Sequence, residues 1–320
     1  MAEFELIDLI RTRCAVTRED VRLGIGDDAA LLAVPAGQAL AVSTDTLVSG
    51  IHFPKSTLPS DIGWKSLAVN LSDLAAMGAA PAWATLALTL PQADREWVAA
   101  FADGFAALAR EFDLALVGGD TTQGPLSITV TVHGFVPEAL ALRRDGAKPG
   151  DGVFVTGTLG DAAAGLRLLE SPSAIGKGKE HFVARLHRPT PRLAQGLLLR
   201  GRAHACIDVS DGLVADLGHV GKASGVGAEI DLTLLPGSPA LREAFAAAAR
   251  APLQLAGGDD YELCFTAPAT VADALLGELA RSGCAATRIG RIVAAPGVRV
   301  CDVHGRLHEP PRAGWQHFSP

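Results

Sequence analysis

Short acidic segments recur along this chain, and most of them adjoin glycine. There are six: Gly26-Asp27-Asp28, Ser43-Thr44-Asp45-Thr46, Asn70-Leu71-Ser72-Asp73, Gly118-Gly119-Asp120-Thr121-Thr122, Asp208-Val209-Ser210-Asp211-Gly212 and Gly257-Gly258-Asp259-Asp260. Carboxylates beside apolar strands are costly to remove from water unless a cation or fixed hydrogen bonds compensate for them. The pattern therefore predicts a site for several hard metal ions with an anionic group between them.

Magnesium fits this donor set, because it prefers oxygen ligands and combines one or two carboxylates with waters and substrate phosphates. Glycines in the same segments let backbone and phosphate approach closely. The sequence has no G-x-x-x-x-G-K-[ST] run, no kinase H-R-D and D-F-G pair and no G-x-G-x-x-G opening a helix. An enzyme of this sequence that uses ATP would therefore depend on its acidic segments and their metal ions.

The elements that must position these segments follow from hydrophobic periodicity, Gly and Pro. In the first half we expect helices at 3–13, 61–77 and 94–111, and strands at 38–42, 82–90, 114–117 and 126–136. Strand 38–42 should deliver Ser43, Thr44 and Asp45 at its end, and strand 114–117 should run into a turn at Asp120. Ser66, Asn70 and Asp73 share one face of helix 61–77, so we expect Asp73 to face a site.

The second half repeats the order of strand, acidic turn and helix. We expect strands at 153–156, 205–209, 228–232 and 262–266, helices at 191–200, 212–224, 239–250 and 271–281, and a mobile loop at 171–180. The polar stretch 143–151 reads as a crossing between domains. The sequence thus predicts an α/β fold in two domains, 1–137 and 149–320.

Composition excludes several classes of protein. The net charge is −7 and the 28 basic residues form no cluster, so nucleic acid is not an expected partner. No segment reads as a signal peptide or a membrane span, so we expect a cytoplasmic location and no membrane partner. The five cysteines are widely separated, which predicts buried thiols rather than disulfides or a zinc site.

Taken in order, the acidic segments resemble those of the thiamine-monophosphate kinases, a family of the aminoimidazole ribonucleotide synthetase-like superfamily. The resemblance extends to Gly24-Ile25-Gly26-Asp27-Asp28-Ala29-Ala30, Val69-Asn70-Leu71-Ser72-Asp73-Leu74-Ala75-Ala76-Met77-Gly78 and Gly257-Gly258-Asp259-Asp260-Tyr261-Glu262-Leu263, and it covers the chain nearly end to end. It implies ATP- and magnesium-dependent phosphorylation of thiamine monophosphate to thiamine diphosphate. It also implies a homodimer in which two N-terminal sheets form a barrel, and it leaves open whether a monovalent cation assists.

The resemblance also assigns roles to residues. It implies metal ligands at Asp28, Ser43, Thr44, Asp45, Asp73, Asp120, Asp208 and Asp211. It implies nucleotide contacts at Gly119, Asp120, Arg144 and Ser210, and substrate contacts at His52, Asp259 and Trp315. Asp45, Asp120 and Arg144 would then neutralise charge during direct in-line transfer, which needs no strong base because the acceptor phosphate is already ionised.

Two of these positions depart from the usual family pattern. Asp259 stands where the family usually has Glu, and Trp315 where it usually has Tyr or another aromatic residue. The shorter side chain of Asp259 keeps the role of an acceptor but alters its reach, and the ring of Trp315 can still stack on a cationic heterocycle.

Simpler interpretations stand beside these assignments. One Gly-Asp pair is ordinary turn chemistry, His52 and Trp315 could be structural, and Arg144 could be a solvated surface residue. Asp27 is at most a secondary ligand, and Asp260 and Glu262 read as structural or supporting residues. Two rival functions remain: another ATP-dependent enzyme of the superfamily, and a non-catalytic protein that binds thiamine phosphate or nucleotide.

Overall fold

The computed structural model describes residues 3–171, 178–302, 304–308 and 314–317. Most of the loop predicted at 171–180 therefore lies outside the described residues. The chain divides into two compact units: unit 1 comprises Met1–Leu74 and Ala79–Ala139, and unit 2 comprises Ala75–Gly78 and Leu140–Pro320. None of the described helices is both long and apolar enough to cross a bilayer.

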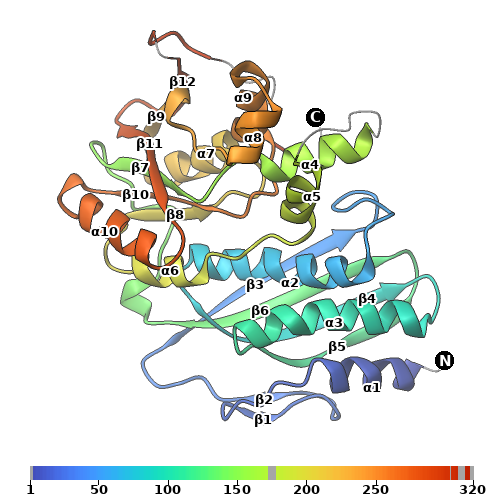
Figure 1. The fold of residues 1–320 in the computed structure, drawn as a ribbon. Helices are drawn as coiled ribbons and strands as arrows, with labels where there is room; N and C mark the ends of the chain where they lie inside the picture. Colours follow the sequence, from blue (N-terminus) through green and yellow to red (C-terminus); the bar gives the residue numbers. More distant parts are fainter. Residues whose placement is uncertain (1–2, 172–177, 303, 309–313, 318–320) are drawn as a thin grey trace. The chain divides into compact units, whose positions relative to one another are not determined.

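Unit 1 is built on a four-stranded sheet with the strand order β3-β6-β4-β5. Its strands are β3 (Ala39–Val48), β4 (Ala80–Leu90), β5 (Ala115–Gln123) and β6 (Ser127–Val136). The helices α2 (Pro59–Ala76) and α3 (Arg95–Glu111) lie across one face of this sheet, as Figure 1 shows. The unit also contains α1 (Glu3–Arg13), the short ribbon β1 (Val21–Leu23) and β2 (Leu31–Leu32), and the 3-10 turn η1 (Glu138–Leu140).

Alternation along the strands separates the two faces of the sheet. Ile128, Val130 and Val132 of β6 are fully buried on the side of the helices. On the other face, β1 and β2 cover only one end, where Trp83 and Phe135 belong to a small buried cluster. The rest of that outer face carries exposed residues of β3 and threonines of β6.

Two strands were predicted to end too early, at 42 and 117, because the acidic segments that follow lie inside the strands. Ser43–Asp45 falls within β3, which pairs with β6 without interruption from Ala39 to Val48. Gly118–Asp120 falls within β5, which runs parallel to β4 as far as Gln123. Both strands are edges of the sheet, and edge strands commonly carry polar or charged side chains.

Unit 2 contains a six-stranded sheet with the order β12-β9-β11-β7-β10-β8. Its strands are β7 (Gly152–Thr156), β8 (Ala205–Asp208), β9 (Gly227–Asp231), β10 (Leu263–Ala267), β11 (Ala286–Val293) and β12 (Gly297–Cys301). Its helices are α4 (Asp161–Glu170), α5 (Lys179–His187), α6 (Leu193–Leu199), α7 (Leu213–Ser224), α8 (Pro239–Ala244), α9 (Ala247–Ala256) and α10 (Ala269–Arg281), with the 3-10 turn η2 (Leu232–Leu234).

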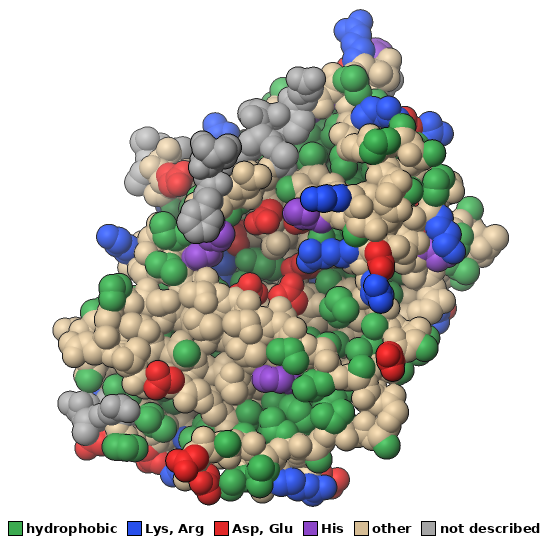
Figure 2. Space-filling model, turned by 180° about the vertical axis from the view of Figure 1, so that it is seen from behind, with side chains coloured by type: hydrophobic (Ala, Val, Ile, Leu, Met, Phe, Trp, Pro, Cys, Tyr) green, Lys and Arg blue, Asp and Glu red, His purple; other side chains and the backbone are tan. Residues whose placement is uncertain are grey.

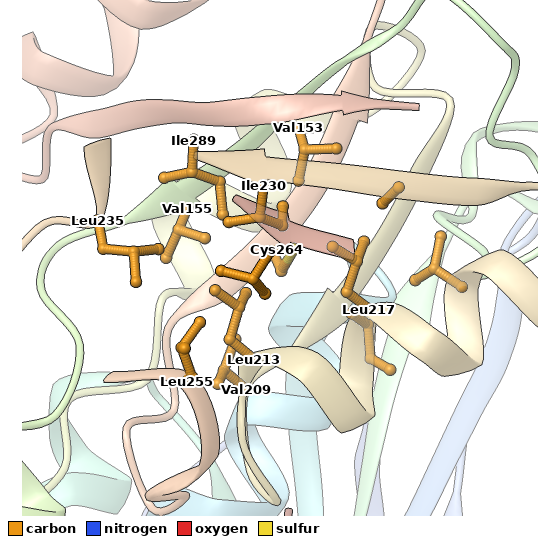
Figure 3. Packing of buried hydrophobic residues seen from close by; sticks show 14 of the residues in the cluster. Val153, Val155, Val209, Leu213, Leu217, Ile230, Leu235, Leu255, Cys264 and Ile289 are labelled. Carbon is orange, nitrogen blue, oxygen red and sulfur yellow. The ribbon is translucent and has the colours of Figure 1, made fainter. Parts of the chain in front are cut away.

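The main core of unit 2 lies between this sheet and the helices α7 and α9. Figure 3 shows Val153 and Ile230 of the sheet above Leu213 and Leu217 of α7, with Leu255 of α9 beside them. Cys264 packs in the same cluster, and four of the five cysteines are buried, as expected for thiols that act as apolar side chains.

Several elements of the fold were not predicted. The sequence analysis gave no element at β1, β2, α4, α5, β11 or β12. The single helix expected at 239–250 is two helices, because Phe245 adopts an extended conformation between α8 and α9. The mixed α/β class was predicted correctly.

Candidate functional site

Ser43 and Asp45 lie on the face of β3 that α2 covers. The Ser43 Oγ donates a hydrogen bond to Asp73 Oδ2 at 2.5 Å, and the Asp45 N–H donates to Asn70 Oδ1 at 3.0 Å. Since side chains alternate along a strand, Thr44 projects from the opposite face, where its hydroxyl lies 2.9 Å from that of a threonine on β6. Unit 1 thus brings Ser43, Asp45 and Asp73 together but turns the Thr44 side chain away, and a ligand role for Thr44 stays a prediction.

Asn70 is a site residue that the sequence analysis did not propose. It is fully buried, its Oδ1 accepts the hydrogen bond from the Asp45 backbone, and its Nδ2 donates to the Ser66 carbonyl at 3.0 Å. Both ends of the amide are therefore satisfied, and the backbone of Asp45 is fixed relative to α2. The spacing of Ser66, Asn70 and Asp73 on one helix face was the signal that pointed to this arrangement.

A second group of predicted residues lies at β5, on the opposite edge of the sheet. Asp28, Gly119 and Asp120 line a cavity of about 760 Å³ whose wall is completed by Ile7 and Arg11 of α1. A Cβ on Gly119 would lie 1.8 Å from the carbonyl oxygen of Leu86 on β4, so only glycine allows this approach of the two strands. The sequence analysis predicted helix 3–13 but did not predict that this helix lines the cavity.

The two groups of unit 1 are well separated within one chain. β3 and β5 are the two edges of the sheet, three strand spacings apart, which corresponds to about 14 Å between their backbones. The pairing register places Asp120 opposite Ala87, on the exposed face of the sheet, whereas Asp45 is on the face of the helices. A magnesium ion with ligands at about 2.1 Å cannot contact both carboxylates of the same chain.

His52 lies in the turn after β3. Its Nδ1 accepts a hydrogen bond from the Val48 N–H at 2.9 Å, and its carbonyl accepts one from the buried Lys65 Nζ at 3.2 Å. Because Nδ1 is an acceptor, the neutral ring carries its proton on Nε2. His52 therefore has a structural role in this turn, and contact with substrate stays a prediction.

In unit 2, the predicted ligands Asp208 and Asp211 lie at the end of β8 and in the loop that leads from it to α7. The three backbone N–H groups of Ser210, Asp211 and Gly212 all donate to Asp216 Oδ2, at 3.0, 3.1 and 3.0 Å. Asp216 is buried in the first turn of α7, and burial raises its pKa to about 7 although the three N–H groups act in the opposite direction. Asp216 was not proposed from the sequence.

The predicted substrate residue Asp259 lies directly against this loop. Its N–H donates to the Ser210 carbonyl at 2.8 Å, and the N–H of Tyr261 donates to the Val209 carbonyl at 2.9 Å. The Tyr261 hydroxyl in turn donates to Asp259 Oδ1 at 3.0 Å. Asp259 and Tyr261 have φ angles of 61° and 50°, a left-handed conformation that costs non-glycine residues energy and is concentrated at functional sites.

Asp260 and Glu262 are buried beneath this turn, in keeping with the supporting roles predicted for them. The carboxylate of Glu262 accepts hydrogen bonds from Arg185 at 3.0 Å and from Arg192 at 2.5 and 2.6 Å. Asp260 accepts the Gly160 N–H with both oxygens, and burial raises the pKa of Asp260 well above its ordinary value. These buried contacts fix the ends of the segment that carries Asp259.

Trp315 also reaches the loop of Asp211. Its N–H donates to the Asp211 carbonyl at 3.0 Å, and the residue is 44% exposed, with its ring beside that of His317. Burial raises the pKa of Asp211, while His219 and His317 lower it. Unit 2 thus gathers Ser210, Asp211, Asp259 and Trp315.

Arg144 is an exposed residue of unit 2 whose carbonyl accepts a hydrogen bond from Ser224 Oγ at 2.8 Å. Its neighbour Arg143 instead forms an ion pair with Asp145 at 2.6 Å. The side chain of Arg143 is thus engaged by a neighbouring carboxylate, whereas the contact described for Arg144 involves its backbone. Contact of Arg144 with a nucleotide stays a prediction.

The donor set fits magnesium in its chemistry. Among the residues that the structure describes, no three acidic, cysteine or histidine side chains are grouped closely enough to hold a metal ion by themselves. Magnesium does not require such a group, because phosphates and waters supply much of its coordination. The oxygen pair of Ser43 and Asp73, next to Asp45, is of the kind that would complete such a shell.

Two known domain families match the chain. Residues 26–136 match the N-terminal domain of AIR synthase related proteins, and residues 148–302 match the C-terminal domain of the same proteins.

Individual proteins match over almost the whole chain. The thiamine-monophosphate kinase of Escherichia coli strain K12 is 49% identical over 99% of this chain and 97% of its own. The crystal structure of thiamine-monophosphate kinase from Stenotrophomonas maltophilia K279a is 55% identical, with a TM-score of 0.88 over 94% of this chain and 96% of that one. A structure described as AaThiL complexed with AMPPCP and TMP is 34% identical, with a TM-score of 0.77 over 99% of this chain and 97% of that one.

Proposed function

Because this chain belongs to the thiamine-monophosphate kinase family, built from the two AIR synthase related domains, we propose that it phosphorylates thiamine monophosphate with ATP to give thiamine diphosphate. The observation that carries the proposal is the end-to-end similarity to a protein solved with AMPPCP, an ATP analogue, and TMP. The kinases of Escherichia coli K12 and Stenotrophomonas maltophilia match over 99% and 94% of this chain, so the chain has the counterpart of both domains.

The reaction joins a phosphate oxygen of thiamine monophosphate to the γ-phosphorus of ATP, and the bond from that phosphorus to the β–γ bridging oxygen breaks. The acceptor oxygen is ionised at neutral pH, so the protein has to align the two phosphates and neutralise their charge. Asp259 and Trp315 would hold thiamine monophosphate, and Ser210 and Arg144 would contact the nucleotide. A direct transfer of this kind requires no phosphorylated protein intermediate.

Magnesium ions would supply most of the neutralising charge when bound. Asp45, Asp73 and Ser43 would hold them at the β3 edge, and Asp28 and Asp120 at the β5 edge. Asp208 and Asp211 would be the metal ligands of unit 2. The arrangement of Asn70 behind Asp45 supports this assignment, because a ligand whose backbone is already fixed loses little freedom on binding a metal.

We also propose that the protein is a homodimer joined through the outer face of the unit 1 sheet. Figure 2, viewed from the side opposite to α2 and α3 in Figure 1, shows this face covered mainly by uncharged side chains. Val42 is 55% exposed there, and the hydroxyl groups of Thr44 and Thr46 pair with those of Thr131 and Thr129 at 2.9 and 2.8 Å. Such a face is suited to a second sheet of the same kind, and two sheets could then close into a barrel.

The dimer would also solve the separation of the two ligand groups. In a barrel closed about a twofold axis that runs along the barrel, the β3 edge of one copy would lie beside the β5 edge of the other. Asp45 of one chain and Asp120 of its partner could then face the same phosphates.

The test is product formation by the purified protein. ATP, magnesium and thiamine monophosphate are supplied together, with free thiamine and an aminoimidazole ribonucleotide precursor as parallel substrates and a reaction without magnesium as control. Thiamine diphosphate formed only from the monophosphate, and only with magnesium, is the expected result. Turnover of the ribonucleotide precursor would favour another enzyme of the superfamily, and binding without turnover would indicate a non-catalytic protein.

A further inference from the structure

The loop 208–212 has the features of a phosphate-binding loop, but its anion-binding groups are occupied. It precedes a helix of 12 residues, α7, and contains three successive N–H groups that converge on one point. Such a group of N–H donors at a helix N-terminus can bind an anion, and phosphate is bound in this way in many proteins. Here a carboxylate oxygen of the chain itself, Asp216 Oδ2, takes that place.

The carbonyl groups of the loop are engaged as well. Those of Val209, Ser210 and Asp211 accept hydrogen bonds from the N–H groups of Tyr261, Asp259 and Trp315, at 2.9, 2.8 and 3.0 Å. The backbone is therefore held on both sides. These backbone groups are thus used within the chain, and two of the three polar side chains of the loop are carboxylates, which suit cations rather than anions.

The contacts of Asp216 are specific to this loop. The residue is buried, with 3% of its surface exposed, and all three hydrogen bonds of its Oδ2 go to residues at or beside predicted ligands. Burying a carboxylate costs free energy unless hydrogen bonds compensate for the lost water, and here the three N–H groups of the loop do so. Its position in the first turn of α7 also makes the loop and the helix one rigid piece.

We propose that Asp216 is a positioning residue for the cation-binding side chains of this loop. Its carboxylate fixes the backbone from Ser210 to Gly212, and with it the position of Asp211, and it occupies the N–H groups at the helix N-terminus that a phosphate would otherwise use. The ATP and substrate phosphates are then held on this side through metal ions and the Ser210 side chain. The inference rests on the proposed function in that the cations it positions serve phosphoryl transfer.

The experiment compares two substitutions at this position with a matched control. Asp216→Asn keeps an oxygen that can accept the three N–H groups, whereas Asp216→Ala removes it. Asp231→Ala is the control, because Asp231 caps η2 in the same unit by accepting the Thr233 N–H at 2.8 Å. Each protein is titrated with Mg²⁺ during turnover at saturating ATP and thiamine monophosphate, and separately with Mn²⁺ alone, followed by electron paramagnetic resonance.

Loss of a residue that orients metal ligands typically lowers metal affinity by about 10–100-fold. We therefore expect Asp216→Ala to raise the Mg²⁺ concentration for half-maximal activity by at least about tenfold, with kcat at saturating Mg²⁺ much less affected. Asp216→Asn should lie between Asp216→Ala and the wild type, and Asp231→Ala should match the wild type. The Mn²⁺ affinities should follow the same order.

Two results would overturn the proposal. One is a wild-type metal dependence in Asp216→Ala; the other is an equal loss in Asp216→Asn and Asp216→Ala, which would mean that charge matters and hydrogen bonding does not. If Asp216→Ala does not fold, Asp216→Ser, whose hydroxyl is too short to reach three N–H groups, replaces it in the same comparison. The Mn²⁺ titration needs no turnover, so failure of the proposed kinase activity would be seen separately.

Discussion

At the scale of single residues, the carboxylates of unit 1 divide into those that stabilise the fold and those that we propose bind a ligand. Asp20 belongs to the first class: it accepts hydrogen bonds from Arg18 and, at 2.9 Å, from Trp83 Nε1. We assign Asp45 to the second by its position: Asn70 Oδ1 holds its backbone N–H at 3.0 Å, on the same face of β3 as Ser43, which contacts Asp73. The same substitution, Asp→Asn, should therefore lower activity in one class and stability in the other.

Asp45→Asn and Asp120→Asn should abolish phosphoryl transfer and leave the fold intact. Each removes a charge that would face a metal ion, and a loss of about 10²–10³-fold or more in kcat is typical for a single electrostatic contact to a transition state. The measurement is kcat beside a thermal unfolding curve, with Asp103→Asn as a surface control. Near wild-type activity in both variants would refute the assignment of these residues to the metal ions.

Asp20→Asn should instead lower stability in a manner that depends on pH. The hydrogen bonds from Arg18 lower the pKa of Asp20, with a further contribution from Trp83. A lowered pKa stabilises the fold above the ordinary pKa of an aspartate, about 3.9, and that contribution disappears as pH falls through the lowered value. We expect a deficit of about 1 kcal/mol at pH 7 that shrinks toward pH 3.

Urea unfolding at pH 7, 5 and 3 measures this deficit. Asp8→Asn serves as the control, because Asp8 forms an exposed pair with Arg11 within one helix and should contribute little. A deficit that stays constant across the pH range would show that the charge of Asp20 has no part in stability.

At the scale of elements, the position of Asp73 depends on how closely α2 and α3 approach each other. Gly63 of α2 and Gly104 of α3 lie at their crossing, where a Cβ would come within 2.0 Å of the Phe101 carbonyl and 1.8 Å of the Ser60 carbonyl, respectively. Both obstacles are backbone atoms, which cannot move aside as a side chain would. The glycines therefore set the distance between the helices, and with it the placement of Asn70 and Asp73 over β3.

Gly104→Ala should destabilise the protein by about 1–3 kcal/mol or more, since overpacking at a contact between backbones forces the helices apart. The matched control is Gly277→Ala in α10, where the nearest atom to a new Cβ is the end of Arg281 at 3.5 Å. Alanine favours a helix there, so the control should gain about 0.5–1 kcal/mol. Chemical denaturation measures the free energy of unfolding of both variants. Equal stability of the two would contradict the close crossing of α2 and α3.

At the scale of the whole molecule, the open question is how residues on opposite edges of one sheet can act on the same phosphates. Unit 1 alone leaves Asp45 and Asp120 about 14 Å apart at the backbone. A homodimer through the outer sheet face would make each active site from two chains. The ligand set would then be complete only in the assembly.

A mixture of two inactive variants tests this directly. Asp45→Asn and Asp120→Asn chains produced together would form mixed dimers in about half of the molecules, and each mixed dimer would contain one site with both carboxylates intact. Activity should therefore recover to about a quarter of the wild-type value. Val42→Glu, placed on the outer face, should abolish the recovery by separating the subunits, as seen by analytical ultracentrifugation. No recovery in dimers proven to be mixed would show that each site lies within one chain.

The sequence by itself determined the family, the α/β class and most of the longer elements, because capping residues, glycines and hydrophobic periodicity act over a few neighbouring positions. It also identified the acidic segments, whose residue types carry their chemistry wherever they are placed. Asp73 on its helix and Asp211 before α7 were found in this way.

Only the tertiary structure decided where those segments lie relative to one another within each unit. That Ser43 and Thr44 face opposite sides of a sheet, that Asp28 and Asp120 share a cavity with α1, and that Asp216 fills the turn before α7 are consequences of strand register and of hydrogen bonds. Glu262 contacts Arg185 and Arg192, which lie 77 and 70 positions away from it in the sequence. No local pattern specifies such partners, because burial and pairing are settled by the packing of the whole unit.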